Sequence, residues 1–162
     1  MHLHKYEKIW LLFGGGVLVL FILILSVNSF AMGMMPPSHM EMIDPTKVDQ
    51  TPPFDNPGLR QVGDNEYELV MTAFIFGYAP NEIEIPAGAK VTFKVTSKDV
   101  VHGFAIPGTN VNMMITPGYI STLTHTFSDP GEYLILCNEY CGIGHQVMAT
   151  RIVVKGKEGE KS

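Results

Sequence analysis

The hydrophobic pattern begins with an apolar stretch over residues 9–27, which contains no charged side chain. As a helix, this stretch is long enough to cross a hydrocarbon core of roughly 30 Å. Trp10 stands at one end, where an amphipathic indole ring favours the membrane interface. The stretch is longer than the apolar core of about 7–15 residues in a signal peptide. The pattern therefore predicts a retained membrane anchor, with a cleaved signal peptide as the alternative.

Basic residues flank this stretch unequally. Lys5 and Lys8 precede it, whereas the next basic residue on its far side is Lys47. Because cytoplasmic flanks carry the excess of Lys and Arg, this asymmetry predicts a cytoplasmic N-terminus. Everything after the anchor would then lie on the periplasmic or extracellular side of the cell membrane.

Residues 30–58 lack a regular hydrophobic period and are predicted to be a linker rich in Met and Pro. The proline pairs Pro36-Pro37 and Pro52-Pro53 prevent long helices and favour extended backbone. Thioethers are soft ligands, so the methionines also allow a copper-handling role. No regular ligand spacing is visible among them, which favours a flexible apolar stretch near the membrane surface.

From about residue 59 the pattern has the period of β-strands. Residues 90–96 alternate between polar and apolar side chains, and residues 67–74 are rich in strand formers. Further short strands are expected at 102–106, 120–127, 133–137 and 147–154, separated by turns that contain Pro and Gly. Short strands at this spacing predict an all-β Greek-key sandwich or barrel over residues 59–155. A charged tail follows at 156–162.

The composition excludes nucleic acid as a partner but does not decide how the two cysteines are used. The net charge is −5, and no stripe of Lys and Arg is present that would follow a phosphate backbone, so nucleic acid is excluded as a partner. The chain has only two cysteines, Cys137 and Cys141. On the oxidising side of a membrane such a pair can form a disulfide or bind a metal.

The segment that carries candidate chemistry reads C-N-E-Y-C-G-I-G-H-Q-V-M over residues 137–148. It places two thiols, an imidazole and a thioether in one predicted loop between two strands. Soft sulfur ligands combined with imidazole favour copper or zinc over magnesium or calcium. Gly142 and Gly144 allow the chain to fold tightly, so that ligands on both sides of them can converge. His102 lies upstream, at the start of another predicted strand.

The number of ligands discriminates among the metals. A zinc ion would be satisfied by the two cysteines, His145 and His102, which leaves the thioether of Met148 without a role. A mononuclear blue-copper site takes one cysteine and leaves the other over. Two coppers bridged by both thiolates use every ligand, with a histidine on each copper, Met148 as a weak ligand and a backbone carbonyl near Glu139 available.

These residues resemble subunit II of heme-copper cytochrome c oxidases. The resemblance rests on the segment over 137–148, on the upstream V-H-G-F over 101–104 and on S-D-P-G-E-Y over 128–133. It covers nearly the whole chain, and the single predicted span is most similar to the small subunit II of B-type oxidases. It implies a cupredoxin-like domain whose binuclear copper ligands are His102, Cys137, Glu139 through its carbonyl oxygen, Cys141, His145 and Met148.

The resemblance also implies a role and partners. The copper centre would take electrons from cytochrome c or a similar carrier and pass them to heme in oxidase subunit I. Oxygen would be reduced to water there with proton translocation, so that this chain would perform no bond chemistry on oxygen. In larger family members the carboxylate matching Glu139 also holds magnesium at the boundary with subunit I. The same role is open here.

The sequence departs from the larger oxidases at the expected contact with the electron donor. Those proteins carry tryptophans and tyrosines on the soluble domain, whereas the only tryptophan here is Trp10. Phe76, Tyr78 and Phe104 are candidates for the point where electrons arrive, with ordinary packing as the alternative for each. His125 lies in a predicted strand and is expected to be an ordinary strand histidine.

Three rival protein classes share part of this pattern. Thioredoxin-like copper chaperones carry Cys-x3-Cys, but with the histidine after the cysteines and a proline behind the second one. Here Gly142 follows Cys141 and His102 precedes both cysteines. A structural zinc or disulfide domain without a redox role is the second rival. Nitrous oxide reductase carries a similar copper centre, but its large catalytic domain does not fit in this chain.

Overall fold

The computed structural model describes residues 4–31 and 38–156. Contacts between residues divide the chain into two units, Met1–Met35 and Pro36–Ser162. Two features predicted from the sequence fall largely outside the described residues. These are the Met-rich stretch, for which residues 32–37 and the side chains of residues 38–40 are not described, and the charged tail from residue 157 onward.

Within its described residues, 4–31, the N-terminal unit forms the helix α1 (Lys5–Ala31), which includes the predicted apolar stretch. Its charged residues all lie in the first turn, where Glu7 accepts a hydrogen bond from the backbone N–H of His4 at 2.8 Å. None of its residues is buried within the structure, and the helix is long and apolar enough to cross a membrane. A long helix that is apolar on all sides suits a lipid environment better than water.

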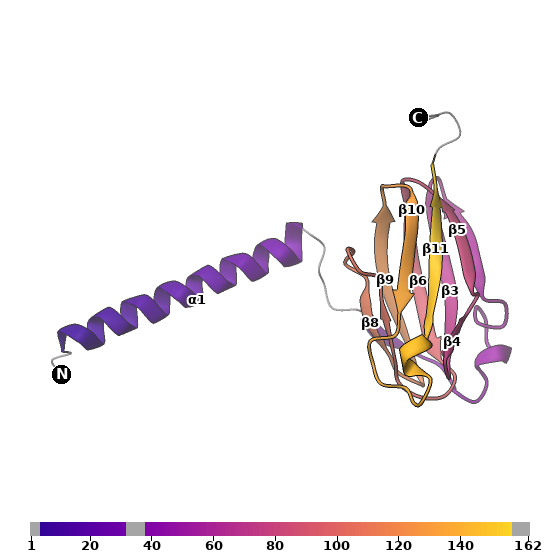
Figure 1. Ribbon diagram of the computed structural model, residues 1–162, viewed down its shortest axis with the longest axis horizontal. Coiled ribbons are helices and arrows are strands. Elements are labelled where there is room, and N and C mark those ends of the chain that lie inside the picture. The colour runs from indigo at the N-terminus through magenta and orange to yellow at the C-terminus, as the bar shows by residue number, and fades with distance from the viewer. Residues whose placement is uncertain (1–3, 32–37, 157–162) are drawn as a thin grey trace. The chain divides into compact units, whose positions relative to one another are not determined.

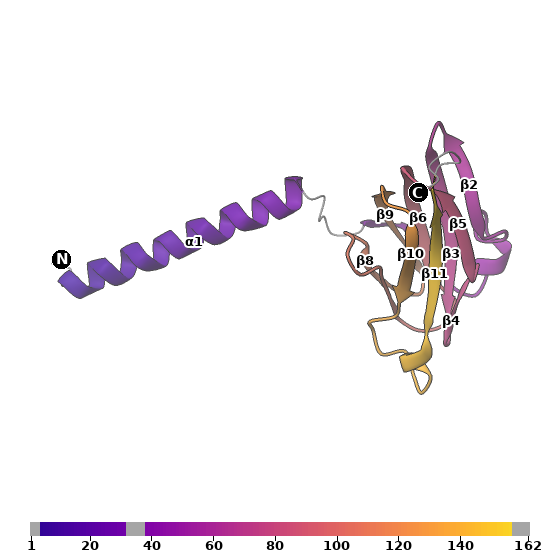
Figure 2. The ribbon, with the colours of Figure 1, turned by 45° about the horizontal axis from the view of Figure 1, so that its top comes forward.

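The C-terminal unit is a sandwich of two sheets (Figures 1 and 2). One sheet has the order β1-β9-β6-β3-β2, with β4 also paired to β3, and the other has the order β5-β11-β10-β7-β8. The pairs β3/β6 and β5/β11 are parallel and the remaining pairs are antiparallel. The strands are β1 Ser38–Met42, β2 Gly58–Gly63, β3 Glu66–Phe74, β4 Gly77–Ala79, β5 Glu82–Pro86, β6 Ala89–Ser97, β7 His102–Ala105, β8 Asn112–Ile115, β9 Tyr119–Phe127, β10 Gly131–Leu136 and β11 Ala149–Lys155. The predicted all-β sandwich is confirmed.

The core lies between the two sheets and follows the two-residue period of the strands. In β6 the apolar side chains of Val91, Phe93 and Val95 are buried, while Lys90 points outward. Phe93 from one sheet meets Phe104 from the other, edge to face, with ring centroids 5.5 Å apart. This aromatic contact holds β7, which carries His102, against the opposite sheet.

The second half of the predicted linker is part of the folded unit. β1 pairs with β9, and a short 3-10 helix follows at Val48–Gln50. Ile43, Val48 and Phe54 form a small buried cluster with Val70 and Ile120. Val70 alternates with the core residues Leu69 and Met71, so these apolar residues cover part of the outer face of the first sheet, a role that the absence of a regular period did not indicate.

This packing predicts a large effect for a substitution outside the expected domain boundary. Phe54 is 0% exposed, so Phe54→Ala should lower the free energy of unfolding by about 3–5 kcal/mol. Met42→Ala, in the same segment but 75% exposed, should change it by less than about 0.5 kcal/mol. Denaturant titration of the full-length chain measures both values. Equal, small effects would contradict the assignment of this segment to the core.

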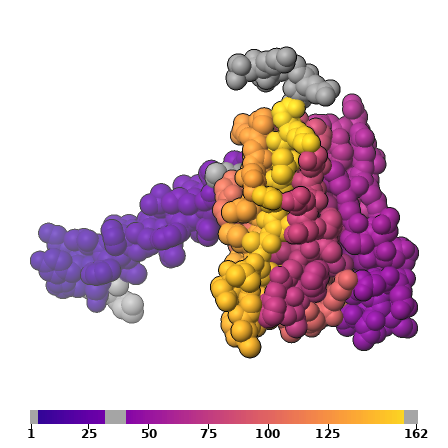
Figure 3. Space-filling view, turned by 45° about the vertical axis from the view of Figure 1, so that its right-hand side comes forward, coloured from indigo at the N-terminus to yellow at the C-terminus, as the bar shows by residue number. Residues whose placement is uncertain are grey.

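The strands also place the candidate ligands. β10 and β11 pair in antiparallel register from Gly131↔Val154 to Leu136↔Ala149, and residues 137–148 connect them at one end of the sandwich. Figure 3 shows the two strands side by side on the surface, in orange and yellow. β7 pairs with β10 at Leu136↔Ala105 and with β8 along its whole length. The loop and His102 are therefore brought to the same end of the domain.

Candidate metal centre

The loop over residues 137–148 is closed by backbone hydrogen bonds, and we call it the ligand loop. The N–H of Cys137 donates to the carbonyl of Met148 at 3.2 Å, which joins the two ends of the loop. Inside it, the N–H of His145 donates to the carbonyl of Gly142 at 3.1 Å, ahead of a 3-10 turn over His145–Val147. Gly142 has a φ of +128°, a backbone conformation that residues other than glycine rarely adopt. These backbone bonds define the shape of the ligand loop.

The two cysteine sulfurs face each other inside the loop. Both cysteines are free and buried, and their Sγ atoms lie 3.8 Å apart. That separation is much longer than the S–S bond of about 2.05 Å in a disulfide. It matches two thiolates on a common metal, since metal–sulfur bonds of about 2.3 Å in tetrahedral geometry place the sulfurs roughly 3.8 Å apart.

The other candidate donors gather around one sulfur or the other. The carbonyl oxygen of Glu139 lies 3.2 Å from Sγ of Cys137. The Sδ atom of Met148 and Nδ1 of His145 lie 3.5 Å and 3.7 Å from Sγ of Cys141. Met148 is buried, whereas Glu139 and His145 are half-buried.

His102 approaches the same two sulfurs from β7. The His102 side chain is 0% exposed. One of its ring nitrogens and the two Sγ atoms all lie within 4.8 Å of one another. Its Nε2 lies 2.8 Å from Oδ1 of Asp99, while its Nδ1 is buried without a hydrogen-bond partner. Buried polar atoms are rarely left unpaired, so an orphaned ring nitrogen beside two thiols fits a metal ligand.

Gly103 places the ligand loop close to β7. Its N–H donates to Sγ of Cys137 at 3.4 Å, and its carbonyl accepts a hydrogen bond from the Tyr78 hydroxyl at 2.5 Å. A Cβ atom at this position would lie 2.5 Å and 2.8 Å from the backbone nitrogens of Asn138 and Glu139. The close approach of the two segments therefore requires glycine.

Burial controls the ionisation of the groups around the sulfurs. It raises the pKa of the Cys141 thiol, with a further increase from the neighbouring Cys137. It also raises the pKa of Tyr78, which stays a neutral donor, again with a contribution from Cys137. Burial works in the same direction on the Asp99 carboxyl, but hydrogen bonds from His102 and from the N–H groups of Val100 and Ile75 outweigh it and lower the pKa.

The three aromatic residues named from the sequence lie at different depths. Tyr78 and Phe104 are buried, and their rings pack edge to face at a centroid distance of 5.6 Å. Phe76 is 41% exposed and lies against Gly142 and Gly144, where an added Cβ would come within 3.4 Å and 2.6 Å of its ring. Of the three, only Phe76 is both exposed at the surface and packed against the ligand loop.

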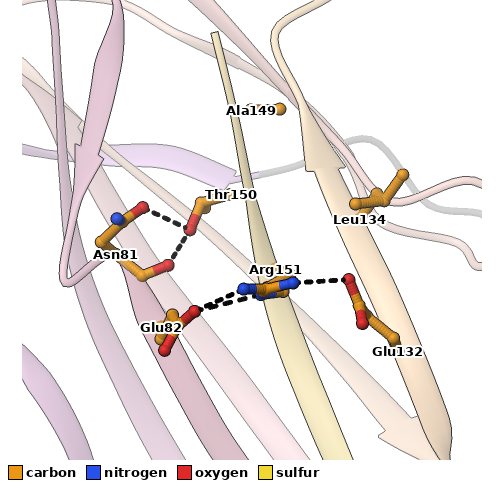
Figure 4. Close-up of a pocket in the computed structure, with 7 residues that line it drawn as sticks. All are labelled: Asn81, Glu82, Glu132, Leu134, Ala149, Thr150 and Arg151. Atoms are coloured by element: carbon orange, nitrogen blue, oxygen red, sulfur yellow. Dashed lines mark hydrogen bonds and ion pairs between the residues drawn. The ribbon is translucent and has the colours of Figure 1, made fainter.

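His125 and the hollow on the outer face of the second sheet lie outside this centre. Nδ1 of His125 lies 2.6 Å from Oδ1 of Asn110, and burial lowers the pKa of the ring. In the hollow, Arg151 bonds to Glu82 and Glu132 at 2.6 Å and 3.2 Å (Figure 4). The guanidinium is thus neutralised by its own neighbours and is not free to bind an anion.

Sequence reasoning missed Asp99, Gly103 and the contact of Phe76 with the ligand loop. Asp99 follows Ser97 in a short polar turn before β7, and such turns are recognisable, but nothing in the sequence indicates which nitrogen they reach. The donor set of thiolate, imidazole and thioether at this site is soft and compatible with copper.

Comparisons with known proteins agree with this geometry. Residues 65–156 match the family model described as the periplasmic domain of cytochrome c oxidase subunit II. One cytochrome c oxidase subunit 2 of Thermus thermophilus is 47% identical over 154 residues, covering 93% of this chain and 92% of that protein. A second Thermus thermophilus subunit 2 is 50% identical over 125 residues, covering 76% of this chain and 93% of its own length.

Solved structures extend the likeness to three dimensions. A chain of a heme-copper terminal oxidase dimer is 31% identical, with a TM-score of 0.79 over 93% of this chain and 100% of that one. The periplasmic domain of subunit II of cytochrome oxidase from Bradyrhizobium japonicum is 21% identical. Its TM-score is 0.52 over 56% of this chain and 85% of that chain. The second likeness concerns the fold alone.

Fold and site together define a cupredoxin-like domain with a cysteine and histidine metal site, preceded by an apolar helix that fits a membrane anchor. The family model and the two Thermus thermophilus relatives show that the chain belongs to the cytochrome c oxidase subunit II family. It is a subunit of a heme-copper oxidase, an oxidoreductase, and associates with other subunits of that complex. The family contains copper, with which the site is compatible.

Proposed function

We propose that the site holds two copper ions bridged by the thiolates of Cys137 and Cys141, and that it is where electrons enter the oxidase. The observation that carries this proposal is the division of donors between the sulfurs. The carbonyl oxygen of Glu139 lies beside Cys137, whereas His145 and Met148 lie beside Cys141. Two clusters of donors joined by a pair of sulfurs suit two ions better than one.

The proposed ligand set assigns every donor. The ligands are His102, Cys137, the carbonyl oxygen of Glu139, Cys141, His145 and Met148. A single tetrahedral zinc ion would leave the buried Met148 thioether idle, and a mononuclear copper ion would leave one thiol over. When bound, the coppers would supply one-electron redox chemistry.

The protein would contribute a rigid and largely buried setting for the metal. The ligand loop is tied at both ends by the Cys137–Met148 hydrogen bond and is held between two paired strands. Cys137, Cys141, Met148 and His102 are all buried, so water has little access. Donors that do not move when the charge changes keep the reorganisation energy low, which favours fast electron transfer.

We infer that electrons arrive from cytochrome c or a similar carrier and leave toward heme in oxidase subunit I. Phe76 is the candidate for the point of arrival, because its ring joins the surface to the loop between Cys141 and His145. Ile143 is 89% exposed on the same loop, and Tyr140 and Val147 are also exposed. Uncharged side chains around the centre suit a short-lived contact with a carrier. Tyr78 and Phe104, being buried, would act only from within the core.

The basic residues at one end of α1 support one orientation in the membrane. Lys5 and Lys8 in its first turn favour a cytoplasmic N-terminus, which would place the copper domain on the periplasmic or extracellular side. A magnesium ion on the Glu139 carboxylate remains an additional prediction. Its other ligands would come from subunit I.

Rapid mixing of the intact oxidase with a reduced carrier tests this role. We expect the visible copper absorption to change before the heme of subunit I is reduced. Reduction of heme at full rate with no preceding change in the copper signal would contradict the proposal. Metal analysis showing zinc in the active complex would contradict it as well.

Met148→Leu tests the weakest proposed ligand. Leucine conserves most of the volume but removes the thioether, so copper should remain bound while the centre loses a donor to its oxidised form. We expect the reduction potential to rise by roughly 59 mV, a tenfold change in the redox equilibrium, together with a shifted absorption spectrum. Val147→Leu, at the exposed neighbour, should leave both unchanged. An unaltered potential and spectrum in Met148→Leu would remove Met148 from the ligand set.

A further inference from the structure

We propose that Asp99 is a positioning residue of the copper centre, which fixes His102 and links it to the segment that packs against the ligand loop. The inference rests on the proposed function, because it concerns how the copper ligands are held. It is drawn from the contacts of the two carboxylate oxygens of Asp99, which reach different parts of the domain.

The first oxygen determines how His102 is presented. Oδ1 of Asp99 lies 2.8 Å from Nε2 of His102, and Nδ1 of the same ring has no hydrogen-bond partner. A carboxylate accepts but does not donate, so the shared proton resides on Nε2. The lone pair of Nδ1 is then free for a metal, and the carboxylate makes the imidazole a stronger donor.

The second oxygen reaches the opposite sheet. Oδ2 of Asp99 accepts the backbone N–H of Ile75 at 2.6 Å, in the turn between β3 and β4. Oδ1 also accepts the N–H of Val100 at 2.6 Å, and the N–H of Asp99 donates to Oγ of Ser97 at 3.2 Å. These bonds leave the carboxylate little freedom to rotate.

The turn held by Asp99 is the one that contacts the ligand loop. Phe76, the next residue after Ile75, has a φ of +66°, which is uncommon for a residue other than glycine. In this conformation its ring packs against Gly142 and Gly144, between the proposed ligands Cys141 and His145. One side chain therefore holds a ligand from β7 and supports the loop that supplies the others.

Replacing this carboxylate should change the redox equilibrium and not only the stability. Without Asp99, the His102 imidazole is a weaker donor and the oxidised centre loses a nearby negative charge. Both effects favour the reduced state. For Asp99→Ala we expect about a tenfold shift of the redox equilibrium toward reduction, which is roughly 59 mV for one electron. Copper affinity should fall by about 10–100-fold.

The experiment uses the full-length chain loaded with copper and compares Asp99→Ala, Asp99→Asn and Asp129→Asn with the unaltered protein. Asparagine retains hydrogen-bond acceptance but not the charge, so it should keep copper and show a smaller rise in potential. Asp129 is exposed at the opposite end of β10 from the ligand loop and serves as the matched control. The measurements are copper content, paramagnetic spectrum and reduction potential.

The outcomes separate this inference from the proposed function. If the unaltered chain forms no two-copper centre, the proposed function fails. If the centre forms, and both Asp99 variants keep its potential and spectrum as Asp129→Asn does, the positioning role of Asp99 is overturned. Should Asp99→Ala lose copper entirely, Asp99→Asn decides: a raised potential supports the role, and an unchanged one overturns it.

Discussion

Cys137→Ser in the intact oxidase is expected to abolish the two-copper centre and, with it, nearly all electron uptake from the carrier. A serine hydroxyl is a hard and weakly acidic ligand, so it does not replace a thiolate that bridges two soft ions. The loss of copper affinity should exceed the about 10–100-fold that a change to an outer-shell partner causes. Metal analysis and turnover with reduced carrier measure the two effects.

A second route of reduction controls for faulty assembly of the complex. A small chemical reductant that reaches the heme of subunit I directly should still support oxygen reduction in Cys137→Ser. Cys141→Ser should behave in the same way, because the two sulfurs face each other at 3.8 Å and share the proposed bridging role. Retention of two coppers and normal turnover in Cys137→Ser would show that the bridge is assigned to the wrong residue.

Gly103→Ala is expected to disrupt the centre almost as severely, although Gly103 supplies no ligand side chain. The added Cβ would overlap the Asn138 side chain and lie 2.5 Å and 2.8 Å from the backbone nitrogens of Asn138 and Glu139. Backbone cannot move aside as a flexible side chain can, so the ligand loop must shift away from β7. We expect the free energy of unfolding to fall by about 1–3 kcal/mol and copper affinity by at least about tenfold.

Gly156→Ala provides the matched control for that substitution. Its Cβ would meet only Pro130 Cγ, at an ordinary contact distance of 3.7 Å. Stability and copper content should therefore stay close to those of the unaltered chain, as measured by denaturant titration and metal analysis. A Gly103→Ala protein that binds copper as Gly156→Ala does would mean that β7 and the loop do not need this close approach.

The parts of the fold that could be predicted from the sequence are those with a strong local period. The alternation in residues 90–96 identified β6, and the uncharged stretch at 9–27 identified α1. Edge strands such as β1, β4 and β8 are short and lack such a period, so they were missed. Their positions are set by pairing with distant strands, which no local pattern encodes.

In the candidate site, too, residues with a local sequence signal could be predicted and tertiary contacts could not. The proposed ligands in residues 137–148 are close in sequence and chemically distinctive, so their types and spacing sufficed to nominate them as candidates. Asp99 could not be recognised, because its role depends on the meeting of His102 with a turn from the other sheet. The contact between Phe76 and Gly144 is likewise tertiary, since it joins the β3–β4 turn to the ligand loop.

The same geometry explains how the domain suits its place in an oxidase. The proposed ligands come from one loop and one strand, which are held by backbone hydrogen bonds and by an aromatic contact in the core. The ring of Phe76 and the exposed Ile143 lie at the same end of the domain as the sulfurs. A carrier that docks there would come close to the centre without unfolding any part of the sandwich.

The most direct test of the two-copper centre is the paramagnetic resonance spectrum of the full-length chain loaded with copper, recorded together with its copper content. Two coppers per chain and a spectrum of one unpaired electron shared equally over both are the predicted results. One copper per chain with an electron confined to it, a zinc-loaded protein without a signal, or a disulfide between Cys137 and Cys141 in the functional form would contradict the account.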